Sequence, residues 1–213
     1  MTVVRAHLAL PSLDDEGLAL ISGCYTNAVF HLRDCQGKDL EKLHRLDQEC
    51  FEAGISYSRA ELNSFIQRRG SFCLVAELES EWISDGIPES TEKSSTLSPK
   101  EGDKDRAQSK TTLKFEPGTI AGFIVAEVHP KGYGHIITID VRQQFRRMNL
   151  GSKLLGAAEE RLRKQNAFMV VLEVAVDNRA AITFYKRYKY NVARTIPRYY
   201  KDELDAFFMT KRL

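Results

Sequence analysis

The sequence has few cysteines, no long hydrophobic run and almost no net charge. Each of these absences argues against a class of protein. Its cysteines, Cys24, Cys35, Cys50 and Cys73, are widely spaced and form no C-x-x-C pair, which predicts reduced thiols. The histidines are scattered as well, so we expect no metal site. The net charge of +2 comes from 31 basic and 29 acidic residues, and it implies no general attraction to nucleic acid or to a membrane.

The N-terminal residues lack the pattern of a targeting segment. Their short apolar run is interrupted by Pro11 and by acidic residues, which argues against a signal peptide. No apolar run elsewhere is long enough to span a bilayer, so we expect a cytoplasmic protein without a membrane partner. Residues 1–25 are interpreted as an N-terminal extension, and residues 26–213 are long enough for a single domain with a full core.

The most informative stretch runs from Ile136 to Leu155 and predicts a strand, a basic turn and the start of a helix. β-branched residues open it, Arg146 and Arg147 lie in the turn, and apolar residues recur at helical spacing after Gly151. The N–H groups of a helix's first turn attract anions, arginine adds charge-assisted hydrogen bonds, and glycine lets a phosphate approach the backbone. The stretch therefore predicts a phosphate-binding loop, and a solvated basic turn is the alternative.

A second strand and a second helix follow this stretch. Residues 168–176 are almost continuously apolar, which is typical of a strand covered on both faces, and Glu173 is the one charged residue among them. Because a helix separates the two strands, we expect them to be parallel and joined by a right-handed crossover. The next helix covers residues 177–185, with Asn178 as its expected N-cap and Tyr185 near its end.

Two motifs in this region resemble those of a known family. The run Arg-Arg-Met-Asn-Leu-Gly from Arg146 is similar to the Q/R-x-x-G-x-G/A signature of the GNAT superfamily of N-acetyltransferases. Asn149 stands at the first glycine position, where Asn tolerates a positive φ. Leu172-Glu173-Val174, Asn178 and Phe184-Tyr185 resemble a segment of the ribosomal-protein alanine N-acetyltransferases and other N-terminal acetyltransferases. The resemblance implies the α/β GNAT fold, a mixed, mostly antiparallel central sheet with a splayed parallel pair and flanking helices.

The same resemblance implies an acetyl-CoA-dependent N-acetyltransferase, an acyltransferase with acetyl-CoA as co-substrate. The acceptor that it implies is the N-terminal α-amine of a protein or peptide. A small-molecule amine acceptor and an acetyl-CoA-binding module without turnover are the alternatives. The coenzyme-binding residues expected by resemblance are Ile139, Val141, Arg146, Arg147, Asn149, Leu150, Gly151, Ser152 and Asn178.

Glu173 and Tyr185 are the catalytic residues that the resemblance implies. Glu173 is then the general base, acting through water, and Tyr185 is the general acid that protonates the coenzyme A thiolate. Each residue also has a plainer interpretation. Glu173 is otherwise an ordinary strand residue or the partner of a basic group, and Tyr185 otherwise packs beside Phe184 and Tyr188.

The N-terminal half predicts a strand over residues 28–33 and two short helices. The first helix begins near Asp39 and ends near Gly54, and the second follows a capping box made by Ser58 and Glu61. In the family that this sequence resembles, the loop between these helices forms one wall of the acceptor groove. Tyr57, on that loop, is therefore a candidate substrate-binding residue.

Tyr199 and Tyr200 are the candidates for the opposite wall of the acceptor groove. They lie in the loop expected between the last two strands, residues 190–196 and 206–212. Tyrosine suits such a wall because it offers rigid apolar area and a hydroxyl for the peptide backbone. Alternatively, the two tyrosines are edge-strand residues that pack on each other.

A segment of different composition separates strands predicted at residues 72–79 and 119–128. Such a polar segment cannot bury enough apolar area to offset the entropy of ordering it, so we expect a disordered insert over residues 84–118. It should sit at the tip of a hairpin, where a long insertion is tolerated. Partner binding and regulation are alternatives to a neutral insertion. The large apolar residues of the segment are Ile87, Leu97, Leu113 and Phe115.

Overall fold

The computed structural model describes residues 28–51, 55–85, 112–200 and 203–213. The expected N-terminal extension, the predicted glycine stop at Gly54 and the middle of the expected insert lie outside these described residues. The strands are β1 (Phe30–Asp34), β2 (Ser71–Leu78), β3 (Trp82–Asp85), β4 (Thr112–Phe115), β5 (Ile120–Val128), β6 (Tyr133–Val141), β7 (Met169–Ala175), β8 (Asn191–Tyr200) and β9 (Leu204–Arg212). The helices are α1 (Leu40–Cys50), α2 (Arg59–Gln67), α3 (Leu150–Lys164) and α4 (Arg179–Arg187), with the 3-10 turns η1 (Gly37–Asp39) and η2 (Gln143–Phe145).

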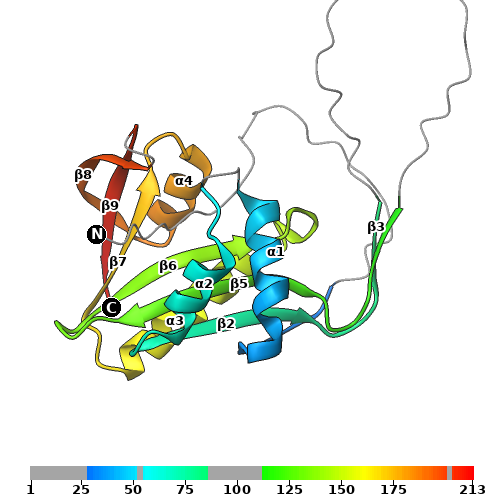
Figure 1. Ribbon diagram of the computed structural model, residues 1–213. Coiled ribbons are helices and arrows are strands. Elements are labelled where there is room, and N and C mark those ends of the chain that lie inside the picture. The colour runs from blue at the N-terminus through cyan, green and yellow to red at the C-terminus, as the bar shows by residue number, and fades with distance from the viewer. Residues whose placement is uncertain (1–27, 52–54, 86–111, 201–202) are drawn as a thin grey trace, which may run out of the picture.

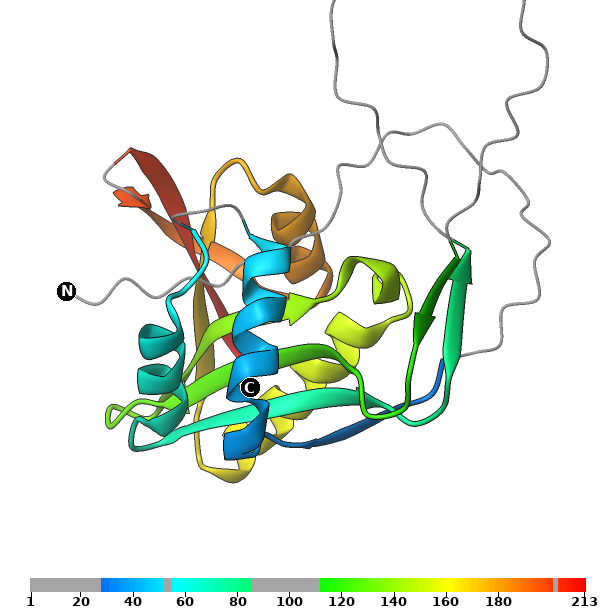
Figure 2. The same cartoon turned by 45° about the vertical axis from the view of Figure 1, so that its right-hand side comes forward.

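One mixed sheet of seven strands forms the centre of the described part of the chain, in the order β1-β2-β5-β6-β7-β9-β8 (Figure 1). Helices α1 and α2 cover one face and α3 covers the other (Figure 2). The apolar residues of each helix recur every three or four positions, which gives each a single buried stripe. The stripe of α1 and α2 packs on one core cluster, and the stripe of α3 packs on a second. The α/β fold predicted from the sequence is confirmed.

Strands β6 and β7 form the single parallel pair of this sheet, and their pairing is short. The register covers Tyr133↔Met169 to His135↔Val171, and β7 then continues alone with β9. Figure 1 shows the two strands together at one end and apart at the other. The splayed parallel pair that the resemblance implied is therefore present.

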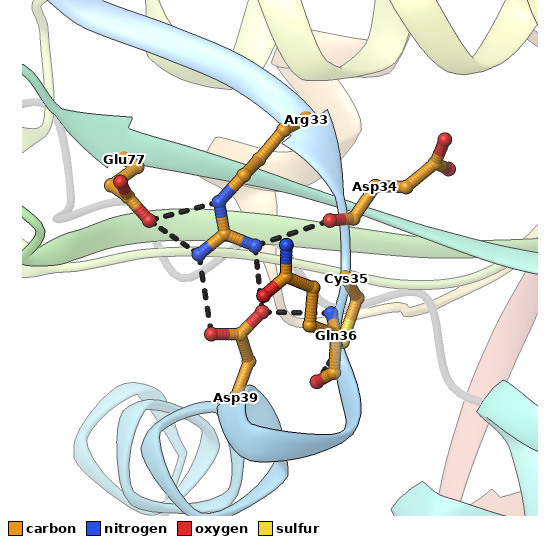
Figure 3. Close-up of polar contacts among 6 residues, drawn as sticks. All are labelled: Arg33, Asp34, Cys35, Gln36, Asp39 and Glu77. Atoms are coloured by element: carbon orange, nitrogen blue, oxygen red, sulfur yellow. Dashed lines mark hydrogen bonds and ion pairs between the residues drawn. The ribbon is translucent and has the colours of Figure 1, made fainter.

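Arg33 fastens the edge strand β1 to β2 and to the start of α1 (Figure 3). Its guanidinium donates to Asp39 Oδ2 at 2.6 Å and pairs with the Glu77 carboxylate. Asp39 Oδ2 also accepts from the Gln36 N–H at 2.8 Å. Burial favours the neutral form of Asp39, but the hydrogen bonds from Arg33 and Gln36 outweigh it and lower the pKa of Asp39. This group of contacts fixes where α1 begins.

Helix α1 ends at Cys50, earlier than the predicted end near Gly54. The next residue, Phe51, has an extended backbone with φ −133° and ψ 149°, and its N–H donates to Asp47 O at 3.1 Å. The expectation of a longer helix was therefore wrong. The capping box before α2 is confirmed, since Ser58 Oγ accepts from Glu61 N at 3.2 Å and the Glu61 carboxylate accepts from Ser58 N at 2.9 Å.

Both ends of the expected insert are ordered, so its predicted bounds of 84 and 118 were too wide. Strand β3 pairs antiparallel with β4, from Trp82↔Phe115 to Asp85↔Thr112. Gly118 N donates to Leu78 O at 2.8 Å and Leu78 N donates to Thr119 O at 2.9 Å, which ties the returning chain to β2. Phe115 is partly buried against the core. Sequence composition missed this hairpin because a few aromatic residues anchor it.

Two further features concern the whole described part of the chain. None of its helices has the length and apolar character needed to cross a membrane. Among the same residues, no three His, Cys, Asp or Glu side chains gather as potential metal ligands.

We propose that residues 86–111 are dispensable for folding. Asp85 and Thr112 are the last pair of the β3–β4 ladder, so an Asn-Gly turn can join them in a two-residue hairpin. This replacement should change the thermal unfolding temperature, followed by circular dichroism, by no more than about 3 °C. A matched deletion of residues 84–118 removes Phe115 and should lower that temperature by about 10 °C. Unfolding of the first variant would show that residues 86–111 are structural.

Candidate functional site

The divergence of β6 and β7 leaves the backbone of β6 facing a gap. Arg142 N donates to Ala121 O at 2.8 Å, which makes the Gly122–Val141 pair a non-hydrogen-bonded pair of the β5–β6 ladder. The N–H and C=O of Val141 therefore point away from β5. Ile139, two residues earlier, has the same orientation. The two residues expected to bind the pantetheine arm thus present backbone groups on the side that β7 has left.

The loop between β6 and α3 has the conformation of an anion cradle. Arg147 and Asn149 have positive φ angles of 64° and 60°, and Asn149 is the N-cap of α3. No side chain caps this helix and its first turn contains no acidic residue, so its N–H groups and the positive end of its dipole are available to an anion. Leu150 is buried at the helix start and Gly151 follows it. This backbone conformation accords with the predicted phosphate-binding loop, whose ligand stays a prediction.

The side chain of Arg146 is directed elsewhere than we expected. Its Nε donates to Val141 O at 3.0 Å and its Nη2 lies 3.9 Å from Cys50 Sγ. Arg146 thus ties the loop to β6 and α1 instead of extending into solvent. The prediction that this side chain supplies a charge-assisted bond to phosphate came from its residue type and from the family resemblance, and it stays a prediction; the observed contacts show that the guanidinium also holds the loop.

Helix α4 lies beside the start of α3. Tyr188 Oη donates to Ser152 Oγ at 2.5 Å, which joins the C-terminal end of α4 to the first turn of α3. Asn178 Oδ1 accepts from Ala181 N at 2.9 Å, so its predicted role as N-cap is confirmed. Two expected coenzyme-binding residues therefore also fix the position of the helix that carries Tyr185.

Tyr185 is fully buried, and its hydroxyl has no hydrogen-bond partner among the described residues. Its ring packs edge-on against Tyr190 with the centroids 5.6 Å apart. Burial and the neighbouring Asp140 on β6 raise the pKa of Tyr185 well above its ordinary value, so the phenol keeps its proton. A buried hydroxyl without a partner is costly, and such groups are typical of sites completed by a ligand.

Glu173 lies in a row of charges that crosses three strands. Its Oε2 accepts from His135 Nε2 at 2.8 Å, and His135 Nδ1 is 3.9 Å from Glu127 Oε1. Arg68, at the end of α2, donates through Nη1 to Glu127 Oε2 at 3.1 Å. The row alternates in sign, and Glu173, at 6% exposure, is its innermost member. One alternative interpretation of Glu173, as the partner of a basic group, is therefore correct, and a catalytic role remains a proposal.

His135 is an imidazolium at neutral pH. Burial opposes its charged form, but the hydrogen bonds and charges of Glu127 and Glu173 outweigh this effect and raise its pKa from 6.5 to about 9. The pKa of Glu127 is lowered, first by its hydrogen bond with His135 and then by Arg68. The mutual neutralisation allows these charged groups to be buried together.

The tyrosines expected to form the acceptor walls are placed differently from the prediction. Tyr199 and Tyr200 lie at the end of β8, after a register shift that follows Ile196, and not in the loop. Their rings are edge-to-face with the centroids 5.0 Å apart, as in the alternative interpretation. Tyr200 is buried and Tyr57 packs edge-on against Phe65 at 5.0 Å. The loop assignment was wrong because the strand continues past Pro197.

The three tyrosines nevertheless come together beside Glu173. The hydroxyl of Tyr200 donates to the backbone oxygen of Glu173 at 3.5 Å. Burial, followed by the neighbouring Tyr199, Tyr57, Glu173 and Tyr185, raises the pKa of Tyr200 well above its ordinary value. The expected base, the expected acid and the expected walls therefore share one region around the diverging strands.

Sequence reasoning missed His135 as part of this site. A signal was present, because a histidine inside a β-branched strand needs a polar partner when it is buried. Glu173 was the one charged residue in the strand expected to run parallel to it. The register, which places His135 opposite Val171, brings the two side chains within reach of each other, and the sequence did not supply that register.

Residues 75–190 match the model of the Acetyltransferase (GNAT) family, which is more than half of the chain. The splayed strands β6 and β7 and the loop with positive φ angles lie within the matched residues. The chain belongs to the GNAT acetyltransferase family.

Curated relatives of this chain carry N-terminal acetyltransferase names. The chain is 33% identical over 102 residues to the N-alpha-acetyltransferase daf-31 of Caenorhabditis elegans, a match that covers 45% of this chain and 56% of that protein. It is 37% identical over 81 residues to an N-alpha-acetyltransferase of Sulfurisphaera tokodaii, covering 38% and 48%. The chain spans about half the length of the curated relatives it matches.

Solved structures share the fold at lower identity. The ribosomal-protein-S18-alanine N-acetyltransferase from Escherichia coli superposes with a TM-score of 0.62 at 19% identity, covering 86% of this chain and 94% of that chain. Ard1 from Thermoplasma volcanium gives a TM-score of 0.60 at 24% identity, covering 86% and 97%. The GNAT architecture therefore extends over most of the chain.

The His135 ion pair predicts a pH-dependent contribution to stability. Since the folded pKa of about 9 lies above the ordinary 6.5, the contribution is complete below about pH 6.5 and is lost as the pH rises through about 9. His135→Gln should therefore lower the free energy of unfolding by about 3 kcal/mol at about pH 6 and by clearly less at about pH 10. Urea denaturation at both pH values measures this, with the exposed His31→Gln as control. An equal loss at both pH values would contradict the assignment of the charge.

Proposed function

We propose that this protein transfers the acetyl group of acetyl-CoA to the α-amine of a protein or peptide N-terminus. The observation that carries the proposal is the buried hydroxyl of Tyr185, which has no hydrogen-bond partner among the described residues and lies near Asp140 on β6. A general acid for a thiolate must be protonated and close to the sulfur, and the gap is where the family's coenzyme arm runs. The raised pKa of Tyr185 keeps this phenol protonated.

The coenzyme would be held mostly by backbone. Acetyl-CoA supplies an activated acetyl group when bound. The outward N–H and C=O groups of Ile139 and the outward N–H of Val141 suit the amides of the pantetheine arm, whereas Val141 O already accepts from Arg146 Nε. The first-turn N–H groups of α3, behind the positive-φ residue Asn149, suit the pyrophosphate. Asn149 in place of glycine preserves this turn, which argues against a module that has lost its coenzyme loop.

Glu173 would accept the proton that the attacking amine loses, through one water. His135 holds the carboxylate in place through the 2.8 Å hydrogen bond and would act as a positioning residue. An α-amine, whose ordinary pKa is about 8, loses its proton more easily at neutral pH than a lysine side chain, whose ordinary pKa is about 10.

The acceptor peptide would enter between Tyr57 and the end of β8. Tyr199 is the partly exposed member of the tyrosine pair there, and Tyr200 supports it from below. The curated relatives are named for N-terminal acetylation, and Naa50 of Arabidopsis thaliana has been solved with a bisubstrate analogue at 20% identity to this chain. These names support a peptide acceptor over a small amine. The free thiols Cys35, Cys50 and Cys73 accord with a cytoplasmic location.

Tyr185→Phe separates catalysis from folding. Because the hydroxyl has no partner within the described part of the chain, its removal should leave the unfolding temperature unchanged or slightly raised. Turnover at saturating acetyl-CoA should fall about 100-fold, since the proton donor is lost. Thiol release and thermal unfolding are the two measurements. Tyr190→Phe is the matched control, because the Tyr190 hydroxyl donates to Glu159 at 2.8 Å and its loss should lower stability. A Tyr185→Phe variant with parental turnover would remove Tyr185 from the mechanism.

An acceptor screen tests the substrate class. Peptides with a free, small N-terminal residue should release coenzyme A thiol, and the same peptides with a blocked N-terminus but a free internal lysine should not. Tyr199→Ala should raise the KM for the peptide about tenfold and leave the affinity for acetyl-CoA unchanged. Turnover of polyamines or aminoglycosides with failure of every free peptide would support the small-amine enzyme. Coenzyme binding without turnover of any acceptor would support the binding module.

A further inference from the structure

Four aromatic rings meet where the β3–β4 hairpin touches the chain just before α3. Phe145, the last residue of η2, is fully buried. Its ring centroid lies 4.9 Å from that of Trp82 on β3 and 4.9 Å from that of Phe115 on β4. Phe30 on β1 is 5.5 Å away in an edge-on arrangement. Tilted and edge-on pairs at such distances are favourable beyond the area that they bury.

Phe145 stands directly before the loop that we assign to the coenzyme. Arg146 follows it, and Arg147 and Asn149 then adopt positive φ angles, which are uncommon for residues other than glycine, and more so for Arg than for Asn. The holding contacts are the Arg146–Val141 hydrogen bond on one side and the buried Leu150 on the other. The Phe145 side chain is the anchor at the point where the loop starts.

The hairpin supplies two of the three rings packed on that anchor. Strands β3 and β4 lie outside the seven-stranded sheet and pair with each other. Figures 1 and 2 both show the hairpin standing beside the sheet. Trp82 is 3% exposed, whereas its neighbour Ile83 is 52% exposed. One face of the hairpin therefore packs against Phe145, and the other face is exposed to solvent. The rings are therefore a lateral brace between the hairpin and the loop.

We propose that Trp82 and Phe115 are positioning residues for the coenzyme. They hold Phe145 and, through it, the backbone of residues 146–152 in the conformation that receives the pyrophosphate of acetyl-CoA. This inference rests on the proposed function, because it needs a coenzyme to bind at this loop. Under this proposal, residues far from α3 in the sequence set the affinity for the coenzyme and do not affect the binding of the acceptor.

Calorimetric titration with coenzyme A tests the brace. Trp82→Ala and Phe115→Ala should each raise the dissociation constant about tenfold, since the loop then samples conformations that do not bind. In steady-state assays the KM for acetyl-CoA should rise by a similar factor, with the acceptor KM and the turnover at saturating acetyl-CoA close to those of the parent. Trp82→Phe keeps a ring on Phe145 and should restore most of the affinity.

Two controls separate positioning from general destabilisation. Ile83→Ala changes the outward face of the same hairpin and should bind coenzyme A like the parent. Phe72→Leu removes core packing at the end of the sheet that is distant from the β6–α3 loop. Phe72 pairs there with Ala126, whereas the loop follows the Gly122–Val141 pair. This variant should lower the unfolding temperature without changing the affinity. If the alanine variants do not fold, Trp82→Leu and Phe115→Leu are used in the same titrations.

The parent protein offers a second readout, since Trp82 is the single tryptophan of the chain. Coenzyme binding should produce a saturable change in its fluorescence, excited at the red edge of its absorption where adenine does not absorb. The midpoint should equal the calorimetric dissociation constant. No fluorescence change on proven binding, or parental affinity in both alanine variants, would overturn the brace while leaving the proposed function intact. Failure of the parent to bind coenzyme A would overturn both.

Discussion

The short parallel pairing of β6 with β7 is the constraint from which the site follows. Three residues on each strand are in register, from Tyr133↔Met169 to His135↔Val171, and the strands then part. The parting leaves the backbone of Ile139 and Val141 without a strand neighbour on the side away from β5. Val141 O accepts from Arg146 Nε on that side. An unpaired backbone group inside a protein needs a partner from elsewhere, and a ligand with amides along its length can supply one. The N-terminus of α3 lies near the end of β6, so the proposed anion site would lie next to the same gap.

The last residues of that parallel register also assemble the charged side of the site. His135 belongs to the final paired triplet, and Glu173 follows its partner Val171 by two residues on the same face of β7. The strands begin to separate there, which makes room for an ion pair between them. Glu127 and Arg68 continue the row outward, so the four charges cancel. The proposed base, Glu173, is thus held by a chain of ion pairs that crosses three strands.

The sequence predicted the order of elements, the parallel pair and the N-caps of α2 and α4, because these depend on local periodicity and on residue types with strong backbone preferences. It also indicated Asn149 as a residue able to replace glycine in a left-handed turn, and its φ of 60° agrees. What it did not predict depends on register or on contacts between distant residues. The Glu173–His135 pair, the direction of the Arg146 side chain and the course of β8 through Tyr200 are of this kind. The hairpin was missed for a related reason, since Trp82 and Phe115 stabilise a segment whose average composition predicts disorder.

The β3–β4 hairpin also has a consequence for the architecture of the chain as a sequence of modules. Because Asp85 and Thr112 face each other across a ladder, the two points that residues 86–111 connect lie about 5 Å apart between Cα atoms. Termini of independently folding domains are often close together in the same way. A foreign domain with closely spaced termini can therefore be inserted between β3 and β4 without distorting the GNAT domain. Since Trp82 and Phe115 of the hairpin contact Phe145, a guest domain placed there would be one aromatic contact away from the residue that precedes the proposed coenzyme loop.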